Sequence, residues 1–417
     1  MDWRVSSAFL SLKLPTISAY TLNSIPFYTP HSGSHASFLE TSVGPATLVL
    51  VHELRALAAS NGSAKRNVGK TWEAAARLLN DTLNVVANEE LDEEGCEVLY
   101  GRAGILYALL LLREELNRVD RAPSDELQKD PVAKAVARIC AEQNLRTLVA
   151  DIIARGQVGA RAYVKEYGEA GAPPLMWSWH NKRYLGGAHG VAGILQMLIS
   201  CPSSVVRDHW SAVVGSLEWL VSAQEPSGNW PSKAGHGSKA SWRPSGGQEV
   251  NELLQWCHGA PGVVILLSTV VRRCAQSRHL PLTDEFQNAL LDALKRGGAL
   301  VYERGLLRKG VGLCHGVAGS VYALLAVSDI LERPAQDGKE WLMRAAHLAL
   351  LAASYRALEE KGEMRTPDRP YSLYEGVAGM CCAWAEVLAR LTKQHGEFEP
   401  HGMPGYDDLV PTTMPPW

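Results

Sequence analysis

Hydrophobic side chains recur at three- and four-residue spacing in several long segments of the chain, with charged residues between them. This period is typical of an amphipathic α-helix with one buried face. Two-residue alternation, which would predict β-strands, is nowhere convincing. The pattern therefore predicts amphipathic helices at Thr71 to Val86, Val132 to Ala154, Ser204 to Ala223, Asp284 to Tyr302 and Gly338 to Leu358.

A second kind of segment is apolar on nearly all sides and begins at a repeated Gly-x-x-Gly motif. Two glycines three residues apart share one face of a helical turn, where they let a neighbouring backbone approach closely. The motif alone is equally typical of tight helix packing. Five copies begin at Gly101, Gly190, Gly259, Gly316 and Gly376, and a degenerate sixth copy at Gly44 keeps only its first glycine.

The two kinds of segment alternate along the chain, which predicts an all-α fold of repeated helical hairpins. An apolar inner helix must be covered on most sides, so we expect an α/α toroid of about six to seven hairpins rather than an open solenoid. The predicted toroid spans residues 31–395. Residues 1–30 are expected to form an irregular segment or a truncated first hairpin, and the proline-rich residues 396–417 a flexible tail.

In a ring, equivalent positions of successive hairpins gather around one end of the central cavity. The residues directly before the first glycines should therefore converge there. Most of these residues carry chemistry that packing alone would not require. They are Tyr100, His189, His258, His315 and Glu375.

Two of these turns also carry a cysteine, at Cys257 and Cys314, two residues before the first glycine of neighbouring hairpins. With His315 they make a set of soft and borderline ligands typical of a zinc ion that keeps its fourth position open. A buried cysteine that only packs as a small hydrophobe is the alternative. The matching Cys-His-Gly contexts favour the metal.

The composition and charge of the chain argue against several classes of partner and location. The chain has 417 residues and a formal net charge of −3, which argues against a nucleic-acid partner because phosphate binding needs a basic surface. Its apolar runs are too short for a transmembrane segment, and the N-terminus lacks a signal-peptide pattern. Binding to a membrane surface is still consistent with the sequence. The eight cysteines form no disulfide framework, so we expect a cytoplasmic protein with reduced thiols.

Four motifs together resemble the lanthionine synthetase C-like family, and its eukaryotic branch more than the bacterial lantibiotic cyclases. They are Gly-Ala-His-Gly at 187–190, Trp-Cys-His-Gly-Ala-Pro-Gly at 256–262, Gly-Leu-Cys-His-Gly at 312–316 and Ser-Leu-Tyr-Glu-Gly-Val-Ala-Gly at 372–379. The resemblance implies a toroid of seven hairpins around a zinc held by Cys257, Cys314 and His315. The chain departs from it before Gly44, where a first hairpin with its own Gly-x-x-Gly is missing.

The resemblance implies addition of a thiol to a dehydroalanine or dehydrobutyrine residue, which forms a thioether. The enolate formed by this addition needs a proton, and His189 is the expected acid because histidine is the side chain whose ordinary pKa lies near neutrality. A hydrogen-bonded core histidine is its alternative. Glu97 stands where the bacterial cyclases carry an acidic residue that assists thiol deprotonation. A solvated glutamate at a helix start is an equal alternative for Glu97.

In the eukaryotic branch the thiol is that of glutathione, whose two carboxylates need cations at the rim of the site. Lys309 and Arg365 match positions used for this in the family, and Arg102 is a third candidate from its place in the first turn. Each could equally be a surface cation. The insert Trp177 to Arg183 is expected to lie over the mouth of the ring, where loops commonly carry recognition.

Three functions are consistent with the sequence. The first is a zinc-dependent enzyme that adds glutathione to dehydroamino acids in peptides or proteins. The second is a non-catalytic glutathione-binding or signalling adaptor, similar to receptor-like members of the family. The third is a six-hairpin glycosidase, which needs two carboxylates in the cavity. Among the residues directly before the first glycines, only Glu375 is a carboxylate, so the sequence disfavours the glycosidase.

Overall fold

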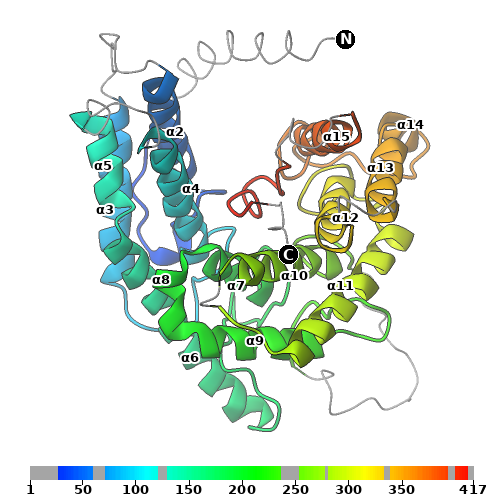
Figure 1. The fold of residues 1–417 in the computed structure, drawn as a ribbon, viewed down its shortest axis with the longest axis horizontal. Helices are drawn as coiled ribbons and strands as arrows, with labels where there is room; N and C mark the ends of the chain where they lie inside the picture. The colour runs from blue at the N-terminus through cyan, green and yellow to red at the C-terminus, as the bar shows by residue number, and fades with distance from the viewer. Residues whose placement is uncertain are drawn as a thin grey trace.

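The computed structural model describes residues 27–59, 71–120, 129–235, 253–277, 280–332, 339–392 and 400–411. Within these ranges the regular elements are helices, accompanied by two isolated β-bridges. The helices lie in two layers around a central axis, as Figure 1 shows. The predicted all-α toroid is therefore confirmed. Among the described helices we find none whose length and hydropathy would let it cross a bilayer.

The inner layer consists of the helices that follow the glycine motifs. Each packs against the next around the axis, and α7, α10 and α12 are buried along most of their length. This burial explains why their sequences are apolar on nearly all sides. The inner helices are α2 (Val43–Ala59), α4 (Arg102–Asp120), α7 (Val191–Ser200), α10 (Ala260–Gln276), α12 (Val317–Leu331) and α15 (Val377–Thr392).

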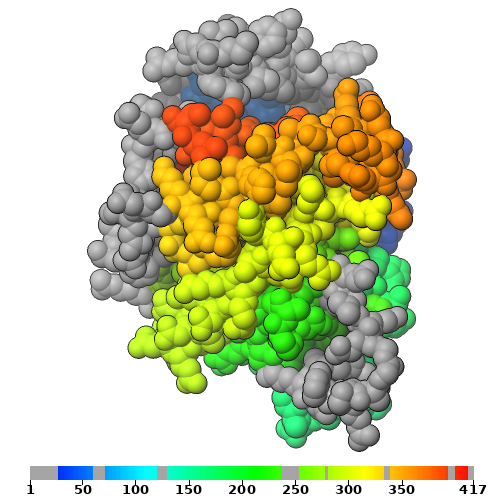
Figure 2. Space-filling view, turned by 90° about the vertical axis from the view of Figure 1, so that its right-hand side faces the viewer, coloured from blue at the N-terminus to red at the C-terminus, as the bar shows by residue number. Residues whose placement is uncertain are grey.

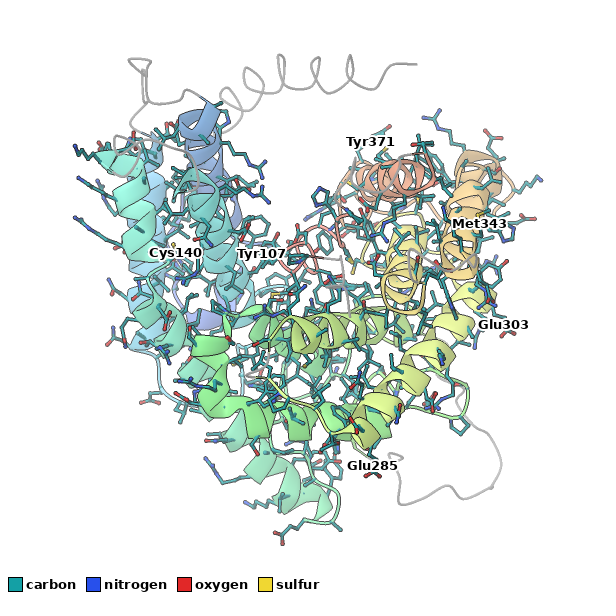
Figure 3. All side chains as sticks on the ribbon, viewed as in Figure 1. Tyr107, Cys140, Glu285, Glu303, Met343 and Tyr371 are labelled. Atoms are coloured by element: carbon teal, nitrogen blue, oxygen red, sulfur yellow. The ribbon has the colours of Figure 1, made fainter. Side chains whose placement is uncertain are left out.

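The outer layer covers the inner helices with their amphipathic partners. Seen from the side, the segments containing α11, α13 and α14 form a continuous outer surface (Figure 2). Figure 3 shows Glu285, Glu303 and Met343 on this outer side. The outer helices are α3 (Thr71–Ala87), α5 (Pro131–Ile139), α6 (Glu142–Tyr167), α9 (Trp210–Ser222), α11 (Asp284–Arg304) and α13 (Glu340–Ala352), with short turns η1 (Gly33–His35), α8 (Ser203–Val206), η3 (Arg207–His209) and α14 (Tyr355–Glu360).

Three of the predicted outer helices are interrupted. The predicted helix from Val132 to Ala154 breaks at Cys140, where α5 ends and the chain turns before α6 begins. Asp130 caps the start of α5 by accepting hydrogen bonds from the Val132 and Ala133 N–H groups, and Pro131 occupies the first turn. Similar breaks separate α8 from α9 and α13 from α14. The helical period continues across such breaks, so the pattern alone does not reveal them.

The ring of inner helices has an open side in the described part of the chain. Helices α2 and α15 form the two ends of the arc and do not pack closely against each other there (Figure 1). The favoured complete closure is therefore not seen among the described residues. Of the segment predicted at 1–30, residues 1–26 lie outside the described part. An inner helix at each end thus lacks one of the two neighbours that the other inner helices have.

The C-terminal residues 400–411 pack inside the ring, whereas we expected a flexible tail at 396–417. Tyr406 and Asp407 are buried at 0% and 2% exposure. The Tyr107 hydroxyl of α4 donates to Asp408, and the Tyr374 hydroxyl donates to the Pro404 carbonyl. Tyr107 points toward this segment in Figure 3. Prolines prevent a helix here but leave carbonyl acceptors, and these are paired by side chains of the ring.

Asp407 and Arg272 form a buried ion pair that joins this segment to α10. The guanidinium donates to the carboxylate at 2.5 Å and also to the Val410 carbonyl at 3.0 Å. Gln196 of α7 donates to the Tyr406 carbonyl at 3.3 Å. Burial raises the pKa of Asp407, and the opposing effect of Arg272 is smaller. The carboxylate is therefore needed mainly as the partner of a buried cation.

We predict that Asp407→Ala lowers the free energy of unfolding by about 3 kcal/mol, because the Arg272 guanidinium would be left buried without a counter-charge. Denaturant unfolding followed by circular dichroism measures the change. Asp208→Ala is the control, since the Asp208 side chain is 65% exposed beside Arg207 and should change stability by no more than about 0.5 kcal/mol. Equal effects of the two substitutions would contradict a packed C-terminal segment.

Candidate functional site

Backbone hydrogen bonds connect the turns that precede the inner helices. The Val98 N–H donates to the Ala188 carbonyl at 3.1 Å, and the Gly187 N–H donates to the Trp256 carbonyl at 3.0 Å. Further along, the Cys257 N–H donates to the Cys314 carbonyl at 3.2 Å, and the Cys314 N–H to the Tyr374 carbonyl at 2.7 Å. Each turn is thus attached to the next. Their side chains are gathered at one end of the ring.

Glycines make this close approach possible. A Cβ atom added at Gly186 would lie 2.0 Å from the Cys257 carbonyl oxygen, far inside van der Waals contact. A Cβ at Gly319, the second glycine of its motif, would lie 2.3 Å from the Leu313 carbonyl oxygen. Both positions therefore require glycine for lack of space rather than for an unusual φ angle.

The turns bring Cys257, Cys314 and His315 together. Their candidate ligand atoms all lie within 4.8 Å of one another, and no other such metal-binding group was found among the described residues. Cys257 is buried, whereas Cys314 and His315 are partly exposed. The cluster therefore has one side closed by protein and one side open to the mouth of the ring.

The two thiols interact strongly with each other. The hydrogen bond with Cys314 lowers the pKa of Cys257 well below its ordinary value, and His315 adds to this effect. The same hydrogen bond raises the pKa of Cys314. By contrast, burial raises the pKa of Cys96 and Cys201 to about 12. A thiolate is thus favoured at this cluster and disfavoured at those two buried cysteines.

This donor set fits a soft divalent metal ion. Two sulfurs and one imidazole nitrogen are the ligands that zinc prefers, and three protein ligands leave a position for a further ligand. The adjacent His258 has a buried Nδ1 atom without a hydrogen-bond partner in the described structure, and burial lowers the pKa of its imidazole. The uncharged form of the His258 imidazole is thus favoured beside the cluster.

Glu97 and His189 form a hydrogen-bonded pair at the same end of the ring. Glu97 is 1% exposed and accepts from the Leu99 N–H at 2.7 Å, from the Tyr100 N–H at 2.8 Å and from His189 Nδ1 at 3.2 Å. An ionised carboxylate can only accept, so Nδ1 is assigned as the protonated nitrogen. This leaves Nε2 as the nitrogen that exchanges a proton with a bound molecule.

Aromatic rings surround the His189 imidazole. The Trp179 ring is stacked on it at a centroid distance of 3.8 Å with an interplanar angle of 9°. Tyr100 and Tyr184 lie 6.2 Å and 6.1 Å away. The insert from Trp177 to Arg183 thus reaches the mouth as expected, although the Trp177 indole turns away and donates to the Ile152 carbonyl.

Cations lie around the same end of the ring. Lys309 directly precedes Gly310, whose carbonyl accepts from the Val317 N–H at the start of α12 at 3.1 Å, so the lysine lies on the same turn as Cys314. Arg365 lies next to it in space, because its N–H donates to the Arg308 carbonyl at 2.8 Å. Both side chains are exposed. The backbone of these two predicted cations thus lies on the Cys314 turn and on the segment paired with it.

Arg102, the third predicted cation, does not lie at the mouth. Its guanidinium is 1% exposed and pairs with Asp151 at 2.6 Å and with Glu89. These partners lie on α6 and just after α3, so the side chain holds outer elements together. Arg102 follows the first glycine of its motif, whereas the converging residues precede it. The prediction that Arg102 binds substrate is therefore wrong.

Two cations and one aromatic residue lie at the mouth besides the predicted glutathione-binding residues. The Lys233 ammonium lies 5.7 Å from the centre of the Tyr184 ring, and the two residues form a β-bridge. Tyr184 in turn lies 5.2 Å from His258. Burial raises the pKa of Tyr100 and the nearby charge of Arg369 lowers it, which places Arg369 at the same end. All three lie in connecting segments without repeat periodicity.

Comparison with known proteins decides the family. The profile of the lanthionine synthetase C-like protein family matches residues 58–395. The chain belongs to this family. It is 30% identical over 294 residues to the zebrafish (Danio rerio) protein named glutathione S-transferase LANCL1, and 30% identical over 309 residues to the Arabidopsis thaliana LanC-like protein GCL1. Both relatives are eukaryotic, which confirms the resemblance seen in the motifs.

These alignments cover 70% and 73% of this chain. They cover 59% of the zebrafish protein and 57% of the Arabidopsis protein. The chain therefore spans less than two thirds of the length of these relatives. The five complete glycine-motif turns and the cysteine–histidine cluster of this LanC-like chain all lie inside the matched residues 58–395, so the site belongs to the shared part.

The cluster should bind one divalent metal ion per chain. We expect Cys257→Ala and Cys314→Ala each to abolish stoichiometric binding, because two protein ligands hold such an ion weakly. Elemental analysis after dialysis measures the metal content. Cys381→Ala is the matched control, since Cys381 is exposed and lies outside the cluster, and it should keep the metal. Full metal content in the Cys314→Ala protein would refute the site.

The contact at Gly186 gives a second prediction. Gly186→Ala must push the Cys257 turn away, so we expect metal affinity to fall by about tenfold or more. Gly215→Ala is the control, because its Cβ would meet only Pro174 side-chain atoms, at 2.8 Å, between outer elements. Competition with a chromophoric chelator gives both affinities. Unchanged affinity in a folded Gly186→Ala protein would show that the turn spacing does not set the ligand geometry.

Proposed function

We propose that this LanC-like protein binds glutathione at a zinc ion held by Cys257, Cys314 and His315. We further propose that it adds the glutathione thiol to dehydroalanine or dehydrobutyrine residues in peptides or proteins and so forms thioethers. One observation carries the proposal: the soft ligand cluster and the Glu97–His189 pair lie on connected turns at one end of the ring. The name of the zebrafish relative, a glutathione S-transferase, supports the choice of thiol.

The chemistry needs a thiolate and then a proton. A zinc ion in such a site supplies Lewis acidity, which lowers the pKa of a bound thiol. Attack of the thiolate sulfur on the β-carbon forms the carbon–sulfur bond, and the π-electron pair of the double bond moves toward the α-carbon and carbonyl as an enolate. His189 donates a proton to the α-carbon and is then reprotonated. The proton that it takes up balances the proton that the thiol released. Overall, S–H adds across the double bond.

The surrounding residues suit these steps. Glu97 orients His189 by accepting from Nδ1, so that Nε2 carries the proton that is transferred. Glu97 thereby acts through His189 rather than on the thiol. We propose that Lys309 and Arg365 pair with the two carboxylates of glutathione.

A cytoplasmic location is part of the proposal. All eight cysteines are free, as expected in a reducing compartment where glutathione is abundant. Zinc ligation requires that Cys257 and Cys314 stay reduced. A non-catalytic glutathione-binding adaptor would need the same cluster and the same cations. The hydrogen-bonded His189 has no evident purpose in simple binding, and this favours the enzyme.

The test uses a peptide with one dehydroalanine, together with glutathione and zinc-loaded protein. We expect a product heavier by one glutathione in mass spectrometry, formed only with protein of full zinc content. His189→Ala should keep its zinc and lose about 10²- to 10⁴-fold in rate, the usual effect of removing a general acid.

His401→Ala is the control, because His401 is exposed at the start of the C-terminal segment, where its N–H donates to Glu386 of α15. Its rate should equal that of the unaltered protein. If glutathione binds with micromolar affinity but no protein-dependent thioether appears, the adaptor function replaces the enzyme. If neither occurs, both are wrong.

A further inference from the structure

The segment from Trp179 to Lys182 forms a tight turn at the mouth of the ring. Trp179 and Lys182 exchange two backbone hydrogen bonds of 2.9 Å and 3.1 Å. The two residues between them, His180 and Asn181, have φ angles of +50° and +56°. Consecutive positive φ values are those of a type I′ turn, which usually contains glycine. Such strain outside glycine persists where the surroundings fix the conformation.

The Glu94 carboxylate holds this turn in place through hydrogen bonds. One carboxylate oxygen accepts from the His180 N–H at 2.9 Å, and the other accepts from the Asn181 N–H at 3.0 Å and from the Ser178 hydroxyl at 2.7 Å. A single side chain thus satisfies both N–H groups of the strained residues. On the far side, Arg183 pairs with Glu166 at 2.6 Å and attaches the turn to α6.

These contacts fix the position of the Trp179 indole ring. Trp179 lies flat on His189 at 3.8 Å, and His189 is only 13% exposed. The hydrogen bond to Glu97 fixes one atom of the imidazole but allows the ring to pivot about it. The indole face removes this freedom, because rotation would drive the imidazole into it. The hydrogen bond to Glu97 and the stacked indole together hold the imidazole in one orientation.

We propose that Trp179 is a positioning residue for the proton donor His189, and that Glu94 holds the turn that places it. The proposal rests on the proposed thioether-forming function. An imidazole with one orientation delivers its proton to one face of the planar enolate. The new α-carbon of the product then has a single configuration, whereas a pivoting imidazole or solvent water would protonate both faces.

The closing experiment measures the configuration of the α-carbon in the thioether product. After acid hydrolysis, chiral derivatisation and chromatography separate the two epimers of the thioether amino acid. Zinc-loaded unaltered protein should give one epimer. Trp179→Leu and Glu94→Gln should give mixtures and a lower kcat with KM for glutathione nearly unchanged, and Trp179→Phe should restore a single epimer because it keeps a stacking face.

Trp341→Leu is the matched control. Trp341 lies on the outer helix α13, where the Arg344 guanidinium stacks on it at 4.4 Å. Its loss should affect stability without changing the epimer ratio. A single epimer from all variants at unaltered kcat would overturn the proposal, since a purely structural tryptophan leaves the product configuration unchanged.

A second readout does not depend on activity. Diethyl pyrocarbonate modifies accessible imidazoles, and peptide mass spectrometry follows its reaction at His189 in the zinc-loaded protein. We expect several-fold faster labelling in Trp179→Leu and an unaltered rate in Trp341→Leu. Equal labelling of His189 in all proteins would show that the indole does not cover it. If the unaltered protein makes no thioether, the proposed function fails, while labelling still decides whether Trp179 holds His189.

Discussion

The hydrogen bonds between successive turns are the constraint on which the site depends. The first N–H groups of a helix have no partner within the helix, and at the inner helices they are accepted by the preceding turn, as between Val317 and the Gly310 carbonyl. The N–H groups of the turns themselves bond to the neighbouring turns, as between Cys257 and the Cys314 carbonyl. This requires backbones in contact, which a side chain at Gly186 would prevent. The two sulfurs are therefore brought together by backbone geometry, and side-chain packing is secondary.

The inner helices also contain polar side chains, which would be costly in an apolar ring unless paired. Gln196, Thr269 and Arg272 are all fully buried. Their partners come from the C-terminal segment, chiefly Asp407, which accepts from Thr269 at 2.7 Å. On the other side of the same segment, the Tyr406 ring meets Trp256 edge-on at 5.1 Å. Since Trp256 precedes Cys257, the segment supports the metal-binding turn from behind.

The sequence predicts best what repeats. Helices and candidate ligands recur at fixed places in each hairpin, so the spacing of Cys257, Cys314 and His315 from their glycines was enough to group them. The prediction that Arg102 binds substrate was wrong, because Arg102 follows its glycine and its side chain pairs with Glu89 and Asp151 away from the mouth. The C-terminal segment was misjudged because proline content indicates disorder only when no cavity exists to receive the chain. Arg369 was missed because its loop has no period.

The site thus has two parts of different origin. The thiol side consists of turns that share one geometry, and any change there must be accommodated by the neighbouring turns. The side that we propose to donate the proton depends on the pair of Glu97 and His189 and on an insert outside the repeat. The insert is held by the Glu94 carboxylate and by a backbone hydrogen bond from Ser178 to the Glu93 carbonyl. A change in the insert need not disturb the metal ligands. In the proposed reaction, the turns of the ring would hold the thiol, and the insert would influence how His189 delivers the proton.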